Sequence, residues 1–188
     1  MPIERLKIKN YRAIRSADIR FGEGANIIVG DNEAGKSTLL EAINLCLRCQ
    51  INRRPLPYEL HPFLINTRAV NDFIASHRAD RPVAPPDVLI ELFLKDSDDV
   101  SILRGSINSE KVDAPGVSLS IKLDEDFQEE YASYISDPQS LSGIPIEYYE
   151  VVWQSFAGAT MKPRAMPIKS TLIDPSKSYC QVWCMSID

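Results

Sequence analysis

The chain has 188 residues, of which 44% are hydrophobic and 25% charged, as expected for a soluble globular protein with a sizeable core. Its formal net charge of −5 is unevenly spread, because residues 1–54 carry ten Lys and Arg against six Asp and Glu. An acidic total argues against a protein that coats nucleic acid, although a local basic contact stays open. Short apolar runs, the absence of a secretion-signal pattern and four irregularly spaced cysteines predict a cytoplasmic protein without a membrane span.

Residues 4–21 show the two-residue alternation of two β-strands joined by a turn at "NYRA". In the first strand, apolar side chains alternate with the basic residues Arg5, Lys7 and Lys9. We therefore expect an antiparallel hairpin with a basic face. That face either meets DNA phosphates or is a solvated edge that discourages further strand pairing.

A β-branched run, "ANIIVG" at residues 25–30, follows the hairpin and predicts a short buried strand. It leads into "VGDNEAGKST", in which Gly30, Gly35, Lys36 and Ser37 fit the pattern G-x-x-x-x-G-K-[ST] of a phosphate-binding loop. The residues that follow place leucines, an isoleucine and a cysteine on one wide helical face. Strand, glycine-bounded loop and helix thus come in the order needed to bind phosphate at a helix N-terminus.

Each part of this loop has an expected role in binding a nucleotide with Mg²⁺. Lys36 is the expected catalytic residue and reaches the β- and γ-phosphates, while the Ser37 hydroxyl binds Mg²⁺. Thr38, one residue further along, turns toward the α-phosphate. Backbone N–H groups of the loop wrap the phosphates. The loop residues expected to bind the nucleotide are Gly30, Asn32, Glu33, Ala34 and Gly35.

Two segments, "LKIKNYRAI" and "FGEGANIIVGDNEAGKSTLLEAI", together with Asn32 inside the loop, resemble the N-terminal halves of SMC-like and RecF-like ATPases. These proteins form the recombination and repair branch of the ABC ATPases. Further along, "PPDVLIELFL", "GSINSEKVDAPGVSLSIKLDEDFQEEYASYI" and "IPIEYYEVVWQSFAG" resemble the overcoming-lysogenization-defect (OLD) family of ATP-dependent endonucleases. The resemblance spans residues 3 to 175.

The resemblance implies an α/β fold of the P-loop NTPase class and ABC/SMC type, with a mixed sheet, the phosphate-loop helix and an antiparallel β layer. It also implies ATP and Mg²⁺ as cofactors and a homodimer formed through the ATPase. DNA would be the substrate of a full-length protein with a C-terminal Toprim nuclease, active in phage defence or repair. Arg12 matches an Arg that lies beside the nucleotide in related ATPases, and Gln154 matches a strand-end Gln that senses Mg²⁺. Each is alternatively an ordinary surface residue.

The proline-rich stretch at residues 78–88 predicts a connection between an N-terminal unit, residues 1–54, and a β-rich segment, residues 87–173. Residues 174–188 show no periodicity and predict an irregular tail. We expect residues 1–188 to form the N-terminal lobe of an ABC-type ATPase domain.

An ABC ATPase also needs an Asp–Glu pair after a buried strand, and a signature segment. Asp124–Glu125 follows a strand that reads as half-exposed, and "SLSGIP" at residues 140–145 comes after that pair, so both are weak candidates. We therefore expect a lobe of a longer ATPase that binds ATP with little turnover. The alternatives are a degenerate regulatory module that binds nucleotide without hydrolysis and, less favoured, a small-molecule kinase. A four-thiolate zinc site is another weak candidate. Its ligands would be Cys46, Cys49, Cys180 and Cys184.

Overall fold

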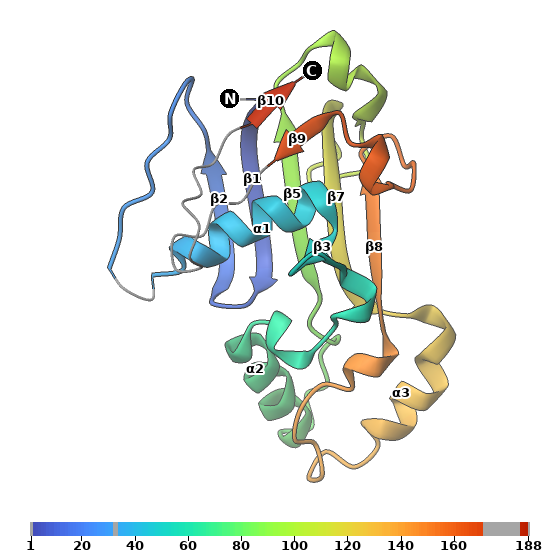
Figure 1. The fold of residues 1–188 in the computed structure, drawn as a ribbon. Helices are drawn as coiled ribbons and strands as arrows, with labels where there is room; N and C mark the ends of the chain where they lie inside the picture. The colour runs from blue at the N-terminus through green and yellow to red at the C-terminus, as the bar shows by residue number, and fades with distance from the viewer. Residues whose placement is uncertain (1, 32–33, 171–184, 188) are drawn as a thin grey trace.

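The computed structural model describes residues 2–31, 34–170 and 185–187. Its centre is a six-stranded sheet in the order β2-β1-β5-β7-β6, with β8 also paired to β7. Helix α1 crosses one face of this sheet (Figure 1). The strands are β1 (Ile3–Tyr11), β2 (Ile14–Arg20), β5 (Val88–Leu94), β6 (Arg104–Gly105), β7 (Ala114–Leu123) and β8 (Tyr149–Ser155).

Three α-helices, several short 3₁₀ helices and two small sheets accompany the main sheet in the described residues. Figure 1 places α2 and α3 together beyond one end of the main sheet, away from α1. The α-helices are α1 (Lys36–Arg48), α2 (Thr67–Arg78) and α3 (Gln128–Tyr134). The small sheets pair β3 (Gln50–Ile51) with β4 (Arg54–Pro55), and β9 (Ile168–Ser170) with β10 (Met185–Ile187). None of the described helices is long and apolar enough to cross a membrane.

The predicted N-terminal hairpin is confirmed, since β1 and β2 pair antiparallel. β1 also pairs with β5, so it is an inner strand and its interpretation as an edge is wrong. Its basic face is neutralised by acids from other segments. The ion pairs are Arg5–Asp18 at 2.6 Å, Arg5–Glu110 at 2.8 Å, Lys7–Glu110 at 3.2 Å and Lys9–Asp87 at 2.7 Å.

The core lies between α1 and the sheet. The apolar face predicted for this helix is buried, and it packs against β1, β5 and β7. Fixing this face against three strands removes a large apolar area from water, which is the main stabilising term for the fold. The buried α1 residues are Leu39, Ala42, Ile43, Leu45, Cys46 and Leu47.

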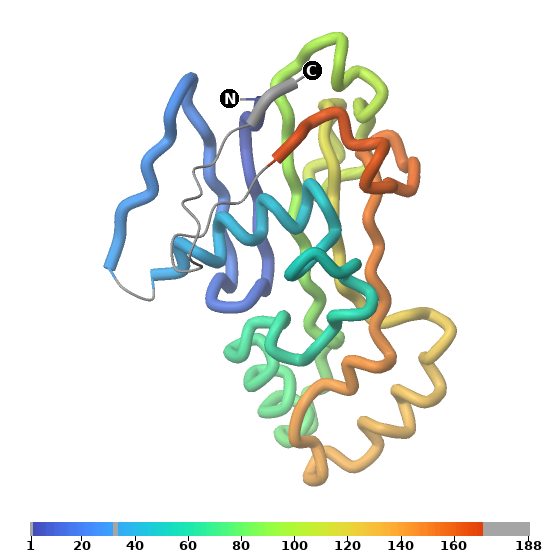
Figure 2. The backbone as a smooth tube through the Cα atoms, in the orientation of Figure 1, coloured from blue at the N-terminus to red at the C-terminus, as the bar shows by residue number. Residues whose placement is uncertain are grey.

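The strand predicted at residues 25–30 is wrong. This segment has no regular secondary structure, and the side chains of Ile27 and Val29 are 86% and 87% exposed. Figure 2 shows the segment as part of a long loop that extends away from the sheet after β2. The predicted mixed sheet is also wrong for the described residues, in which all strand pairs are antiparallel. A β-branched run becomes a buried strand only beside a partner strand, and none of the described strands pairs with this one.

The C-terminal part of the predicted β-rich segment contains β7 and β8, paired antiparallel along their length. Residues 171–173 of this segment, and residues 174–184 and 188 of the expected tail, lie outside the described residues. Its described part is not irregular, because Met185–Ile187 forms β10 against β9. The expectation of an irregular tail is therefore wrong at this point.

Candidate phosphate-binding site

The phosphate loop ends at Gly35, which adopts the left-handed conformation with φ 87° and ψ 13°. A side chain is strained in this region, so the loop needs glycine where it turns into α1. A Cβ atom at Gly35 would lie 3.4 Å from Cγ1 of Ile14, at the start of β2. The end of the loop therefore lies against the N-terminal hairpin.

The N-terminus of α1 is prepared for an anion. Gly35 offers no side-chain cap, and the first turn carries no acidic residue. The first N–H groups of a helix have no partner within the helix and carry the positive end of its dipole. Oxygen atoms of a phosphate fit this position better than any uncharged ligand does.

Lys36 folds back over the loop. Its Nζ donates to the carbonyl oxygens of Gly30 at 2.6 Å and Asp31 at 2.5 Å. The structure thus brings Gly30, Ala34, Gly35, Lys36, Ser37 and Thr38 together around the start of α1. Asn32 and Glu33 lie outside the described residues, and their predicted roles stay predictions.

Arg12 reaches the same helix from the turn between β1 and β2. Its Nη2 forms an ion pair with Oε1 of Glu41 at 2.8 Å, and its Nε donates to the hydroxyl of Tyr11 at 3.3 Å. Glu41 follows Ser37 by four positions, so the two side chains lie on one face of α1 about one turn apart. Burial, and then the nearby Glu41 carboxylate, raise the pKa of Tyr11 well above its usual range, which keeps the hydroxyl protonated. The predicted site residue Arg12 is therefore close to the first turns of α1.

A protein-family model described as an AAA domain (AAA_23) matches residues 5–142, from β1 through the phosphate loop and β7 to the segment after α3. The chain belongs to this AAA domain family. This agrees with an α/β protein that carries a P-loop and an antiparallel sheet.

Similarity to individual proteins is limited to part of the domain. The chain is 58% identical over 45 residues to the DNA double-strand break repair Rad50 ATPase of Methanopyrus kandleri, which covers 24% of this chain and 5% of that protein. It is 51% identical over 45 residues to the DNA replication and repair protein RecF of Magnetococcus marinus, covering 24% of this chain and 12% of that protein. The RecF of Vibrio cholerae is 31% identical over 88 residues, covering 44% of this chain and 24% of that protein. The matched regions thus span a quarter or less of these relatives.

Gln154, which lies beyond the residues matched by the family model, is not brought together with Ser37. The preceding residue, Trp153, donates its indole N–H to the Cys46 carbonyl of α1, and neighbouring strand residues point to opposite faces. Gln154 instead lines a pocket of about 510 Å³ on the far face of the sheet, together with Glu91 and Ser118. The two residues predicted to bind Mg²⁺ therefore lie on different sides of the main sheet, an arrangement that does not favour the metal role of Gln154.

The far-face pocket contains a buried carboxylate that the sequence did not reveal. Glu91 is 2% exposed, and both of its oxygens accept hydrogen bonds from Ser109, one from the backbone N–H and one from the hydroxyl. Lys7, its cross-strand neighbour, donates to the same hydroxyl at 2.8 Å. Ser109 therefore links the negative charge of Glu91 to a lysine ammonium group.

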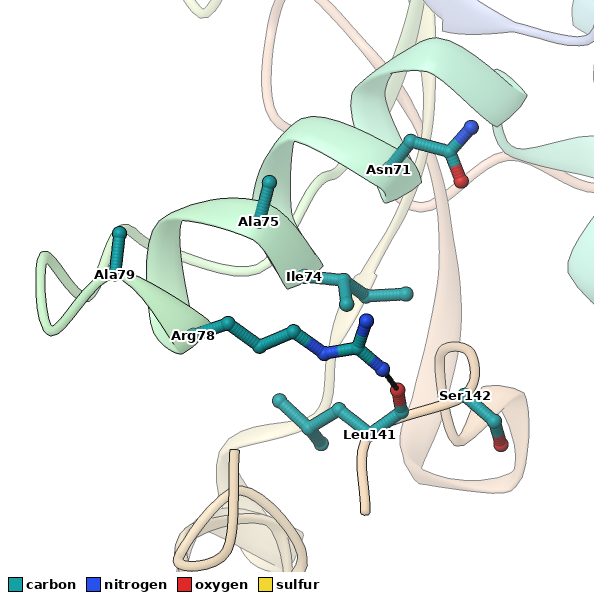
Figure 3. Close-up of a pocket in the computed structure, with 7 residues that line it drawn as sticks. All are labelled: Asn71, Ile74, Ala75, Arg78, Ala79, Leu141 and Ser142. Carbon is teal, nitrogen blue, oxygen red and sulfur yellow. Dashed lines mark hydrogen bonds between the residues drawn. The ribbon is translucent and has the colours of Figure 1, made fainter. Parts of the chain in front are cut away.

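A second pocket, of about 630 Å³, lies between α2 and the segment that contains Leu141 and Ser142 (Figure 3). Arg78 extends from α2 toward this segment and donates through Nη2 to the Leu141 carbonyl at 2.8 Å. Leu141 belongs to the weak signature candidate at residues 140–145, and its side chain is buried. This pocket is part of the group of helices beyond the sheet and shares no residue with the phosphate loop.

The weak catalytic candidate Asp124–Glu125 has a structural role. The Asp124 carboxylate accepts a hydrogen bond from the Asp126 N–H at 3.0 Å and caps a short 3₁₀ helix, Glu125–Phe127. Helix α3 follows directly after this turn. The pair therefore lies in the connection between β7 and the helices that follow it.

The zinc candidate is not supported by its described half. Cys46 is fully buried on α1, and burial raises the pKa of its thiol far above the usual range, which disfavours the thiolate that zinc needs. Cys180 and Cys184 lie outside the described residues. Among residues 2–31, 34–170 and 185–187, no three His, Cys, Asp or Glu side chains form a metal-binding group.

Proposed function

We propose that this AAA domain is the ATP-binding lobe of an ABC/SMC-type DNA-repair ATPase. The observation that carries the proposal is the left-handed Gly35, which turns the loop into an uncapped helix with Lys36 folded over it. The Rad50 and RecF relatives, whose names describe repair proteins, support the assignment to this branch. When bound, Mg·ATP supplies a phosphoanhydride whose terminal phosphate can be transferred to water.

The residues of the chain divide the work of holding the nucleotide. When nucleotide binds, the Lys36 ammonium group leaves the carbonyls of Gly30 and Asp31 and donates to the β- and γ-phosphates instead. The first N–H groups of α1 donate to the phosphate oxygens. Ser37, an exposed residue, contributes its hydroxyl as a ligand to Mg²⁺. Arg12 adds a further positively charged group, after Lys36 and Mg²⁺, beside the first turns of the helix.

The finer part of the proposal is a parent protein of the OLD type, an ATP-dependent DNA endonuclease that acts in phage defence or repair in the cytoplasm. It rests on the resemblance of the segments from β5 to β8 to that family. Dimerisation through the ATPase, contact with DNA and a Toprim nuclease belong to that full-length protein.

A binding-only regulatory module is the second candidate. The observation that favours it is the use of the Asp124 carboxylate as a helix cap, which leaves the Asp–Glu candidate in a structural role. Such a module would bind Mg·ATP and change its association with a partner, without releasing phosphate. A small-molecule kinase is the weakest candidate.

Calorimetry with Mg·ATP tests the proposal on three proteins: wild type, Lys36→Ala and Lys162→Ala. Lys162 is an exposed lysine away from the loop and serves as a matched control. We expect wild type and Lys162→Ala to bind alike and Lys36→Ala to lose binding. The absence of binding to wild type would contradict the proposal. Phosphate release, followed on the same samples, separates the two candidates, because sustained release would rule out the binding-only module.

A further inference from the structure

The backbone of Arg12 is held in an unfavourable conformation by hydrogen bonds to both its N–H and its carbonyl group. Its φ of 46° lies in the left-handed region, which costs a residue other than glycine about 1 kcal/mol or more. The Arg12 N–H donates to the Leu64 carbonyl at 3.0 Å, and its carbonyl accepts from Nδ2 of Asn66 at 2.6 Å. Both partners lie more than fifty positions away in the sequence. This tertiary clamp keeps the strained turn in place.

The side chain of Arg12 is fixed as well. Its Nη2 pairs with Glu41 and its Nε contacts the Tyr11 hydroxyl, while the guanidinium carbon lies 5.8 Å from the centre of the Tyr11 ring. A guanidinium is planar and carries five N–H donors, so two contacts orient the whole group. The N–H groups of Nη1 take no part in either contact, so they can donate to a ligand that reaches this side of the group.

The fixed guanidinium lies on the side of α1 where the terminal phosphates are expected. Glu41 is on the same helix face as Ser37, the expected Mg²⁺ ligand, and Mg²⁺ bridges the β- and γ-phosphates of bound nucleotides. The position of Ile14, whose Cγ1 would lie 3.4 Å from a Cβ atom at Gly35, places the hairpin that carries Arg12 beside the loop. An arginine directed to this face therefore meets the triphosphate at its terminal end.

We propose that Glu41 and Asn66 are positioning residues that preset Arg12 for the terminal phosphate of a nucleoside triphosphate. This rests on the proposed function, because it requires nucleotide at the phosphate loop. Glu41 does not compete with the phosphate for Arg12. If Arg12 left it, a bare carboxylate would remain about one turn from a polyanion, which is electrostatically unfavourable. The Arg12 guanidinium instead keeps its Nη2 paired with Glu41 and offers the N–H groups of Nη1 to the phosphate.

The test is a double-mutant cycle with Mg·ATP and Mg·ADP, measured by calorimetry on wild type, Glu41→Gln, Arg12→Ala and the double variant. Glu41→Gln should weaken Mg·ATP binding about tenfold, as expected when a charge-assisted contact is lost, and leave Mg·ADP binding unchanged. The double variant should bind Mg·ATP as Arg12→Ala does, because Glu41 acts only through Arg12. Equal weakening for both nucleotides, or an effect of Glu41→Gln that persists without Arg12, would overturn the proposal.

Two further variants separate positioning from general stability. Asn66→Asp keeps an oxygen that caps α2 but loses the N–H donated to the Arg12 carbonyl. It should therefore also weaken the binding of Mg·ATP and leave the binding of Mg·ADP unchanged. Asp72→Asn removes the exposed ion pair with Arg15 and is the matched control, with no expected change for either nucleotide.

A readout without nucleotide keeps this proposal distinct from the proposed function. The Arg12 Nη–H signals in nitrogen–proton NMR spectra should be protected from exchange in wild type, because Nη2 pairs with Glu41, and should lose that protection in Glu41→Gln. If wild type binds no nucleotide, the proposed function fails and the preset role fails with it. If it binds but the Arg12 signal is unprotected, only the positioning role is overturned.

Discussion

The indole N–H of Trp153 donates to the carbonyl oxygen of Cys46 at 2.7 Å, which joins the inner face of β8 to the last turns of α1. Carbonyl groups near the end of a helix lack a partner within the helix. Trp153 satisfies one of them inside the core, where water does not reach, so the contact fixes the far end of the helix that begins at the phosphate loop.

Replacement of Trp153 by Phe should therefore lower the free energy of unfolding by about 1–3 kcal/mol, because it leaves a buried carbonyl unsatisfied. Urea denaturation followed by circular dichroism measures the change. Tyr134→Phe is the control, since its hydroxyl makes only a long contact of 3.4 Å to the Gly143 carbonyl. An equal loss in both variants would show that the indole N–H has no special role.

Ser109→Ala should also destabilise the protein by about 1–3 kcal/mol. It removes the hydroxyl between the buried carboxylate of Glu91 and the ammonium of Lys7, so the carboxylate keeps only the backbone N–H as donor. Ser101→Ala, which removes an exposed hydroxyl bonded to the Asp98 carbonyl, should change stability by less than about 0.5 kcal/mol. Thermal unfolding of the two variants side by side checks the difference.

Gly35→Ala should weaken Mg·ATP binding and cost about 1 kcal/mol of stability, because alanine strains at φ 87°. Gly24→Ala is a matched control, since Gly24 has φ 75° and open space around its Cβ position. It should show a similar loss of stability with unchanged nucleotide affinity. The prediction is wrong if both variants bind Mg·ATP like wild type.

Stability should fall on the alkaline side because of the cysteines on and after α1. The ordinary pKa of a cysteine thiol is 9.0. Burial raises the pKa of Cys46 far above this value and raises the pKa of Cys49 to about 11. Above pH 9 the unfolded chain releases these protons while the folded chain retains them, so the unfolded state gains free energy of ionisation. The contribution of the protonated thiols to the free energy of unfolding is complete below pH 9. It is lost as the pH rises toward the pKa values that Cys46 and Cys49 have in the folded protein.

At pH 9.5 the expected loss is about 1 kcal/mol per thiol relative to pH 7.5. Urea titrations at the two pH values measure it. A Cys46→Ala/Cys49→Ala double variant, less stable at both, should show a smaller difference between them. If its pH dependence matches that of wild type, other groups cause the alkaline loss.

Local sequence patterns predicted part of the fold well. The alternation in residues 4–21 gave the hairpin, and the helical periodicity after Ser37 gave the buried face of α1. Helix α2 was missed although its signals are present. The Asn66 side chain caps α2 by accepting hydrogen bonds from the backbone N–H groups of Arg68 and Ala69, and the buried residues of the helix recur at helical spacing.

Predictions failed where a distant partner decides the structure. Residues 25–30 have strand propensity, yet propensity alone does not supply a neighbouring strand. The roles proposed for Glu41 and Asn66 depend on contacts with Arg12 across 29 and 54 positions, and no local pattern marks them. For Gln154, the contact of Trp153 with α1 and the pocket shared with Glu91 reveal which face of β8 it occupies.

The pairing of β1 with β5 has a consequence for how the chain folds. Ile3 and Leu94 are register partners although 91 positions separate them (94 minus 3). On a growing polypeptide, the first strand must wait until the fifth has been synthesised before its second edge is covered. Pairing at this range is slow, because a long loop has to close first, and an uncovered strand edge invites association with other chains. We therefore expect the interval between these two strands to be the stage at which nascent chains most need a chaperone.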